Sequence, residues 1–407
     1  MSLKPLKPSK PLKPLKPLKP LKPLKPLKHL FRICGGMADT LDLGSSSARS
    51  VGSSPTRCTN VLCGLLLAAV AAVLPFAGQA IFEFKPDRDY TTAKLVRPRP
   101  ADFDTYWLNE IARQRMQVPL EIAAVVREPS EDIDASACWD VTVPALADHP
   151  VRGWLAIPRD AAAKSLPLIV RFDGHTTTTA LRLAYPKAIV FSVNPCGCDN
   201  GKDKAYYDRF FGKWDYMHRG WANRDTCWFH GQIMRVVRAL EWAKTLPEWN
   251  GKDLLVFGKS MGGSQALQAA ALDSAVTVCG VIDPALCDHA GTLDLVNPRP
   301  SGWPQIYRNA KARPSICDPA KALETSDYYE NAFFARRITC QTFFASGLKD
   351  RTCPTEGVYL VYRNVRGPKQ FVTDPNAWHC KSANRPYEEC RDAILKSAGK
   401  PMPDSRK

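Results

Sequence analysis

The sequence predicts an α/β protein with a mostly parallel sheet that is covered by helices on both faces. Two observations carry this prediction. From about residue 138, short apolar runs rich in Val, Ile and Phe follow one another, and longer segments with helical spacing lie between them. Several runs are almost continuously apolar, as is typical of strands buried on both faces. The runs span residues 138–145, 151–158, 167–174, 188–195, 253–260, 277–284, 341–348 and 369–374.

Two segments between these runs have the spacing of helices. Residues 226–246 place apolar side chains every three to four positions, and residues 260–271 continue as a helix of small residues. Because parallel strands need crossover connections, this alternation favours a parallel sheet.

The first 60 residues differ in composition from the rest. Residues 3–28 repeat Leu-Lys-Pro with eight prolines, which predicts an extended, solvated arm. Residues 33–60 are rich in Ser and Gly without an apolar period, which is typical of a linker. We therefore expect residues 1–60 to be disordered. In the alternative interpretation, the native protein begins after this region and does not contain it.

Residues 61–80 have the pattern of a signal peptide. Their apolar run follows Arg57, ends in small residues and is interrupted by Pro75, so it suits a signal better than a membrane span. An uncleaved anchor is the alternative. The remaining residues, 81–407, are expected to form a single domain with an aromatic-rich insertion near residues 200–230.

The charge of the chain is unevenly distributed. The net charge is +16, but residues 1–80 carry 12 Lys and Arg against 2 Asp and Glu, and the remainder carries 44 against 38. The predicted domain is thus only weakly basic, so we expect neither a nucleic-acid partner nor stable membrane association.

Cysteine usage indicates an oxidising compartment. Eleven of the 14 cysteines follow residue 80, which favours a secreted or periplasmic protein with disulfides. Cys196 and Cys198 could be a pair of metal ligands. No second pair and no nearby histidine has ligand spacing, however, so no metal is expected.

The segment Gly258–Gly262, "GKSMG", has two interpretations. A phosphate-binding loop would need glycine at position 253, where the chain has Asp253. The G-x-S-x-G interpretation requires a strand, a tight turn and a helix, and the flanking residues supply all three. Ser260 is therefore the candidate nucleophile.

A serine nucleophile needs a histidine that takes its proton and a carboxylate that orients the histidine. Of the two histidines after Ser260, His289 follows too soon to leave room for an acid strand, so His379 is the candidate base. Asp350 lies just beyond the carboxyl end of a predicted strand, and loops at the carboxyl ends of strands build the active sites of such sheets. Asp350 is therefore the candidate acid. Asp283, beyond the preceding strand, is the alternative acid.

The oxyanion that forms in such a reaction needs two preorganised N–H donors. The backbone amide of Met261 is one candidate. The other is the backbone amide of His175, because Asp173-Gly174-His175 follows an early strand and lets the backbone approach. No cofactor is required by this chemistry.

These motifs resemble the acetyl xylan esterase and cephalosporin-C deacetylase family of α/β-hydrolases over residues 98–396. The matching segments are "RPADFDTYW" at 99–107, "FDGH" at 172–175, "GKSMGG" at 258–263, "GLKDRTCP" at 347–354 and "WHC" at 378–380. The resemblance implies the α/β-hydrolase fold, hydrolysis of small acyl esters such as acetyl groups on sugars, no metal, and frequent assembly into homo-oligomers.

The chain departs from the family pattern in four places, one of which is Met261, where glutamine is common. Asp173-Gly174 stands where the family has His-Gly, residues 194–201 stand where Arg-Gly-Gln is expected, and Cys380 replaces the usual glutamate. These departures affect the expected substrate and assembly more than the mechanism.

Two local features lie near the expected site. Residues 206–229 contain nine aromatic residues, among them Trp214, Tyr216 and Trp221, which either stack on sugar rings or pack a lid of their own. Cys353 and Cys380 are close in sequence to the acid and the histidine, so a disulfide between them would fasten both loops.

The sequence thus predicts a secreted or periplasmic serine esterase that acts on acetylated saccharides or other small esters. A serine peptidase or another acyl hydrolase of the same fold is the alternative. A carbohydrate-binding relative without catalytic activity is a third.

Overall fold

The computed structural model describes residues 89–175, 178–212 and 217–381, all of which belong to one compact unit, Gln79–Lys407. The predicted arm, linker and signal segment lie outside these residues, and they remain predictions. Over the described ranges, no helix combines the length and the apolar character that crossing a membrane requires.

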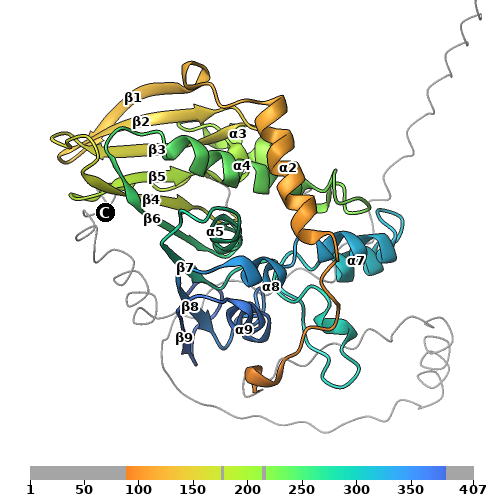
Figure 1. Ribbon diagram of the computed structural model, residues 1–407. Coiled ribbons are helices and arrows are strands. Elements are labelled where there is room, and N and C mark those ends of the chain that lie inside the picture. The colour runs from red at the N-terminus through yellow and green to blue at the C-terminus, as the bar shows by residue number, and fades with distance from the viewer. Residues whose placement is uncertain (1–88, 176–177, 213–216, 382–407) are drawn as a thin grey trace, which may run out of the picture. The chain divides into compact units, whose positions relative to one another are not determined.

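One nine-stranded sheet forms the centre of the described unit (Figure 1). Its strand order is β1-β2-β3-β5-β4-β6-β7-β8-β9. Strands β4 to β9 run parallel to one another, and the pairs β1–β2, β2–β3 and β3–β5 are antiparallel. Each of the eight predicted runs overlaps one strand from β2 to β9, so the α/β class and the mostly parallel sheet are confirmed. The strands are β1 (Val126–Ile133), β2 (Ser136–Val143), β3 (Val151–Pro158), β4 (Leu166–Phe172), β5 (Ile189–Val193), β6 (Trp249–Lys259), β7 (Val278–Ile282), β8 (Gln341–Gly347) and β9 (Lys369–Asp374).

The helices include the two that the sequence predicts. Residues 226–246 contain α4 (Trp228–Ala243), and residues 260–271 match α5 (Met261–Leu272). The other helices are α2 (Phe103–Gln117), α3 (Lys204–Phe211), α6 (Ile306–Ala312), α7 (Pro319–Asp327), α8 (Asn331–Phe334) and α9 (Thr355–Asn364). Short 3₁₀ turns are η1 (Tyr90–Thr92), η2 (Ile122–Ala124), η3 (Pro195–Gly197), η5 (Gly291–Leu293) and η6 (Ala335–Arg337).

The central strand β4 shows why its sequence is continuously apolar. Leu168, Val170 and Phe172 enter a large core that also contains buried residues of α4 and α5. Ile169 enters a smaller core on the opposite face, together with Tyr185. Both faces of the strand are therefore buried, as expected for the interior of a parallel sheet.

The parallel arrangement brings several loops to one edge of the sheet. The segments after β4, β6, β7, β8 and β9 all leave from carboxyl ends of parallel strands, which lie at the same edge. These segments contain every site residue that the sequence predicts.

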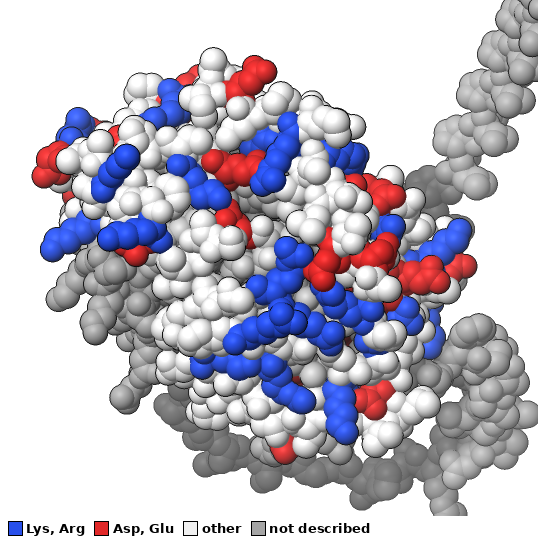
Figure 2. All heavy atoms as spheres, viewed as in Figure 1, with Lys and Arg blue, Asp and Glu red and all other residues white. Residues whose placement is uncertain are grey.

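The opposite edge carries a basic cavity of about 490 Å³. It is lined by one carboxylate, Asp104, and by four arginines, Arg99, Arg336, Arg337 and Arg366. Arg337 donates to Asp104 over 2.9 Å. Figure 2 shows Lys and Arg side chains gathered around the region of α8 on this face. The cavity lies at the amino ends of β7, β8 and β9, away from the predicted catalytic loops.

Candidate active site

The serine lies in a sharp turn between β6 and α5. Ser260 has a φ of 53°, which is strained for a residue with a side chain. Glycines on both sides make the turn possible: a Cβ at Gly258 would lie 2.1 Å from the carbonyl oxygen of Gly262. The backbone therefore presents the hydroxyl of Ser260 at the carboxyl edge of the sheet.

Ser260, His379 and Asp350 form one hydrogen-bonded chain. The Oγ of Ser260 lies 2.9 Å from Nε2 of His379, and Nδ1 of the same ring lies 2.6 Å from Oδ2 of Asp350. Both contacts are satisfied when the hydroxyl of Ser260 donates to Nε2 and the Nδ1–H of His379 donates to the carboxylate. The three residues come from the loops after β6, β9 and β8, so the structure brings together the nucleophile, base and acid that the sequence predicts.

Asp350 is fixed by its own loop. It is buried, and its Oδ1 accepts the backbone N–H groups of Thr352 (2.7 Å) and Cys353 (2.9 Å). Oδ2 is thereby turned toward the imidazole. The carboxylate has little freedom to leave its orientation.

The charge of Asp350 affects the protonation of His379. Burial alone would lower the pKa of His379, but the hydrogen bond to Asp350 and the contact with Cys380 outweigh it and raise the pKa to about 10. The imidazolium is thus strongly stabilised once it has taken a proton. The neutral form, which accepts a proton from serine, gains population as pH rises.

Asp283, the alternative acid, binds backbone amides in the structure. Its side chain is buried, and its two oxygens accept the backbone N–H groups of Gly347 (3.0 Å) and Cys380 (2.9 Å). Burial and the nearby Asp350 raise the pKa of Asp283 to about 7. Asp283 therefore connects the end of β8 to the histidine loop, and Asp350 is the carboxylate that contacts the imidazole.

The turn after β4 packs directly against the serine turn. A Cβ at Gly174 would lie 2.9 Å from the carbonyl oxygen of Lys259, and one at Gly262 would lie 2.2 Å from that of Phe172. The side-chain amide of Gln265 donates to the carbonyl of Asp173 over 3.1 Å. Glycine is needed at both crossing points, and the backbone around Gly174 lies beside Ser260.

The two predicted oxyanion donors belong to these turns. Met261 is the first residue of α5, and a helix leaves the amides of its first turn without intrahelical partners. His175 lies in the segment after β4, and burial lowers the pKa of its ring to about 4, so the ring is neutral. The part that their amides play in catalysis remains a prediction.

Two tryptophans lie next to the chain of site residues. Trp303 contacts the ring of His175 with a centroid separation of 5.1 Å, and its amide donates to the carbonyl of Thr352 in the acid loop. Trp378 immediately precedes His379, is 48% exposed, and has the guanidinium of Arg351 over its ring. Neither tryptophan could be predicted as a site residue from the sequence, because exposure and ring contacts depend on the tertiary fold.

The aromatic-rich segment contributes mainly to packing. Trp221 is buried, as are Tyr207, Phe211 and Phe229, and all four belong to the large core. Trp214 and Tyr216 lie outside the described residues. The described part thus agrees with the interpretation of a segment that packs a core rather than a sugar-binding surface.

His289 is surrounded by charges and takes no part in the serine contacts. Nδ1 lies 2.8 Å from Glu330, and Nε2 lies 2.8 Å from Asp327. Arg97 donates to Asp327 through two nitrogens. Burial opposes the charged ring, but the two carboxylates outweigh it and raise the pKa of His289 to about 9.

The suggested disulfide is not formed in the structure. In the described part of the chain, both Cys353 and Cys380 carry free thiols. The thiol of Cys380 instead lies 3.7 Å from Nε2 of His379. The expectation that a bond between these residues fastens the two loops is therefore wrong for this structure, in which Asp283 makes a polar connection to the histidine loop.

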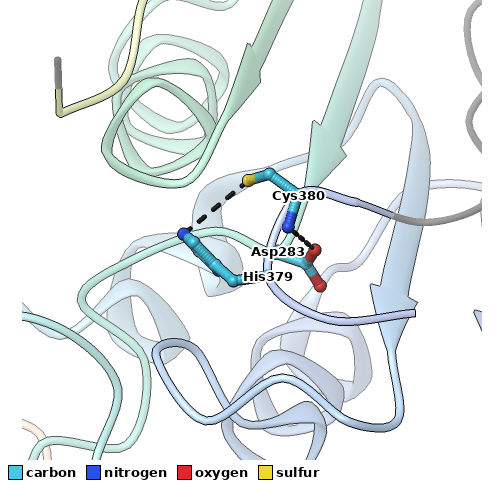
Figure 3. A group of neighbouring side chains, drawn as sticks. All are labelled: Asp283, His379 and Cys380. Carbon is cyan, nitrogen blue, oxygen red and sulfur yellow. Dashed lines mark hydrogen bonds between the residues drawn. The ribbon is translucent and has the colours of Figure 1, made fainter. Parts of the chain in front are cut away.

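Asp283, His379 and Cys380 are also a group with the chemistry of metal ligands. One ligand atom from each lies within 4.8 Å of the others (Figure 3). Imidazole, thiolate and carboxylate all bind zinc in proteins. The sequence predicted no metal, because neither a second pair nor a nearby histidine has ligand spacing to Cys196 and Cys198. The group around His379 forms only in the folded chain.

The sheet order, the serine turn at its carboxyl edge and the adjoining histidine and acid loops define an α/β-hydrolase. Residues 86–390, well over half of the chain, match the family model described as acetyl xylan esterase (AXE1). The chain belongs to this acetyl xylan esterase family. It is a carboxylic ester hydrolase, and the family supports acetyl esters as the bonds that it cleaves.

Individual relatives agree with this assignment. The chain is similar to acetyl esterase Axe7A of Xylanibacter ruminicola, with 27% identity over 311 residues that cover 73% of this chain and 68% of the relative. A solved acetyl xylan esterase from Paenibacillus sp. R4 has a TM-score of 0.61 and 22% identity, covering 75% of this chain and 96% of that one. Acetyl xylan esterase 1 from Thermoanaerobacterium sp. JW/SL YS485 has a TM-score of 0.62 and 17% identity, covering 77% and 98%. These two structures support the fold.

Proposed function

We propose that the protein is a secreted or periplasmic serine esterase that removes acetyl groups from carbohydrates, with Ser260, His379 and Asp350 as its catalytic residues. The observation that carries the catalytic part is the hydrogen-bonded chain from Ser260 through His379 to Asp350, with heavy-atom distances of 2.9 Å and 2.6 Å. These distances fit direct proton transfer between the hydroxyl and the imidazole.

The reaction follows from this arrangement. His379 takes the proton of Ser260 while the Oγ attacks the ester carbonyl, and Asp350 stabilises the imidazolium that results. The backbone amides of Met261 and His175 hold the oxyanion. His379 then gives its proton to the leaving sugar hydroxyl, and water attacks the acetyl-enzyme with His379 as the base again.

A carbohydrate substrate is supported by the relatives and by one surface residue. The similar proteins are named as acetyl esterase and acetyl xylan esterases. Trp378 exposes nearly half of its surface directly beside His379. An exposed indole offers a flat apolar face with a polar edge, which suits contact with a sugar ring.

The location outside the cytoplasm rests on the sequence. Residues 61–80 have the pattern of a cleaved signal, and the cysteine content fits an oxidising compartment. We expect the mature protein, isolated from its host, to begin near residue 81. A mature N-terminus upstream of residue 60 in a cytosolic fraction would refute this part of the proposal.

The test of the catalytic proposal is acetate release from acetylated xylan. The wild-type protein and a Ser274→Ala control, changed at an exposed serine away from the catalytic loops, are expected to release acetate, and Ser260→Ala is expected to release none above background. Equal activity of Ser260→Ala would refute the assignment of the nucleophile.

Two further assays address the alternatives. A small chromogenic acetate ester separates an esterase from a carbohydrate-binding relative without activity, because only the esterase cleaves it. Acylated peptides test for a peptidase. Cleavage of peptides in preference to both acetate esters would contradict the proposed substrate class.

A further inference from the structure

Cys380 places a sulfur atom beside the imidazole of the proposed base. Its Sγ lies 3.7 Å from Nε2 of His379, the same nitrogen that lies 2.9 Å from Oγ of Ser260. Figure 3 shows the thiol turned toward this ring nitrogen, while the backbone N–H of Cys380 faces Asp283. Two atoms with high affinity for thiophilic metals thus face the same small space.

The separation of the two atoms fits one tetrahedral zinc ion. Zinc binds thiolate at about 2.3 Å and imidazole at about 2.0–2.1 Å, which places sulfur and nitrogen about 3.6 Å apart at a tetrahedral angle. The observed separation is 3.7 Å. The distance between the two atoms is therefore the one that a shared zinc ion requires.

The surroundings of His379 match those of a metal-bound histidine. A histidine that binds a metal through one nitrogen usually donates its other N–H to a carboxylate, which fixes the ring and makes the free nitrogen a better ligand. Nδ1 of His379 lies 2.6 Å from Oδ2 of Asp350. The contact that prepares the imidazole to accept a proton prepares it equally to accept a metal ion.

Asp283 adds negative charge close to the pair. Its carboxylate belongs to the group whose ligand atoms lie within 4.8 Å of one another. Because its two oxygens already accept the N–H groups of Gly347 and Cys380, we assign it an electrostatic part and leave direct ligation to the thiolate and imidazole.

We propose that His379 and Cys380 form a binding site for a thiophilic divalent cation such as Zn²⁺, and that the bound ion inhibits the esterase. The thiol of Cys380 and the protonated Nε2 of His379 release their protons to solvent, the sulfur and the ring nitrogen bind the ion, and water or Ser260 completes the coordination. Nothing is oxidised or reduced. The nitrogen that would take the serine proton is then occupied.

Binding of the metal ion is independent of the proposed function, whereas inhibition of the esterase rests on the proposed function. The experiment therefore measures both. Zn²⁺ is titrated into the full, chelator-treated chain by calorimetry, and acetate release is measured at each concentration. Cd²⁺ is titrated in parallel, because a cadmium–thiolate bond produces an ultraviolet charge-transfer band that reports on the sulfur directly.

Cys380→Ala removes the sulfur, and Cys340→Ser is the matched control. Cys340 is a partly exposed free cysteine just before β8, at the opposite edge of the sheet. Wild type and Cys340→Ser are expected to bind Zn²⁺, lose activity and recover it with a chelator. Cys380→Ala is expected to need at least about tenfold more Zn²⁺ for half-inhibition, since even outer-shell partners change metal affinity by about 10–100-fold.

A second variant keeps the inference open to refutation if Cys380→Ala folds poorly. His379→Asn retains the thiol but removes the nitrogen ligand, and it is expected to bind Zn²⁺ and Cd²⁺ weakly in the calorimetric and spectroscopic titrations. Equal Zn²⁺ binding by wild type and both variants would overturn the site, as would absence of binding to wild type. Zn²⁺ binding that depends on both residues in a chain without esterase activity would support the site while refuting the proposed function.

Discussion

Replacing His289 with glutamine tests the buried charge network behind the active-site loops. His289 is held between Asp327 and Glu330, each 2.8 Å from one ring nitrogen. Glutamine has a similar length and can bond to one carboxylate, but it carries no positive charge. The variant therefore removes the charge of the ring from a site where both partners are buried.

The size of the effect follows from the pKa of His289, which rises from 6.5 to about 9 in the folded protein. At about 1.4 kcal/mol for each pH unit between these two values, the rise corresponds to about 3–4 kcal/mol of stability. Because the folded-state pKa is raised, this stability is fully present below pH 6.5, declines as pH rises and is lost above about pH 9.

Urea unfolding of wild type and His289→Gln, carried out below pH 6.5 and again above pH 9, measures this effect. The difference in free energy of unfolding between the two proteins is expected to shrink by about 3–4 kcal/mol across that interval. Titrating groups that do not contact His289 are common to both proteins, so they cancel in the difference. A difference that is the same at both pH values would refute the argument that His289 is held as an imidazolium.

Three further substitutions test the site. Asp350→Asn should leave the fold intact and lower kcat for a chromogenic acetate by about 10⁴-fold, because an amide favours the wrong imidazole tautomer; an unchanged kcat would contradict this. Gly262→Ala places a Cβ 2.2 Å from the carbonyl oxygen of Phe172, so it should lower the free energy of unfolding by about 1–3 kcal/mol in urea titrations, and an unchanged value would show that the turns do not meet there. Trp378→Ala should raise KM for acetylated xylan but not for a small acetate ester, and equal KM changes for both substrates would argue against a sugar contact.

The strands could be predicted from the sequence because burial on both faces leaves continuous apolar runs. The eight runs match β2 to β9, but β1 was not predicted. β1 (Val126–Ile133) is an edge strand whose residues are mostly exposed, with Glu128, Pro129 and Glu131 among them. Charged residues and proline on an edge strand prevent it from pairing with other chains. Because these residues take the place of apolar ones, the strand lacks the apolar alternation on which strand prediction depends.

The site residues were accessible to prediction to different degrees. Ser260, Asp350 and His379 could be ordered along the chain because the chemistry demands all three and parallel strands bring their loops to one edge. The connection from Asp283 to the backbone of Cys380 could not be predicted, because backbone contacts between distant loops leave no residue pattern. The sequence places Cys380 directly after His379, but the direction of its thiol depends on the fold of the histidine loop.

The most direct test of the central claim is peptide mapping of the enzyme after inactivation by an organophosphonate that reacts with activated serines. We expect a single adduct on Ser260, formed in parallel with the loss of acetate release and absent from His379→Asn, in which the hydroxyl has lost its base. Loss of activity with the adduct on another residue, such as Cys380, or with no adduct at all, would contradict the central claim.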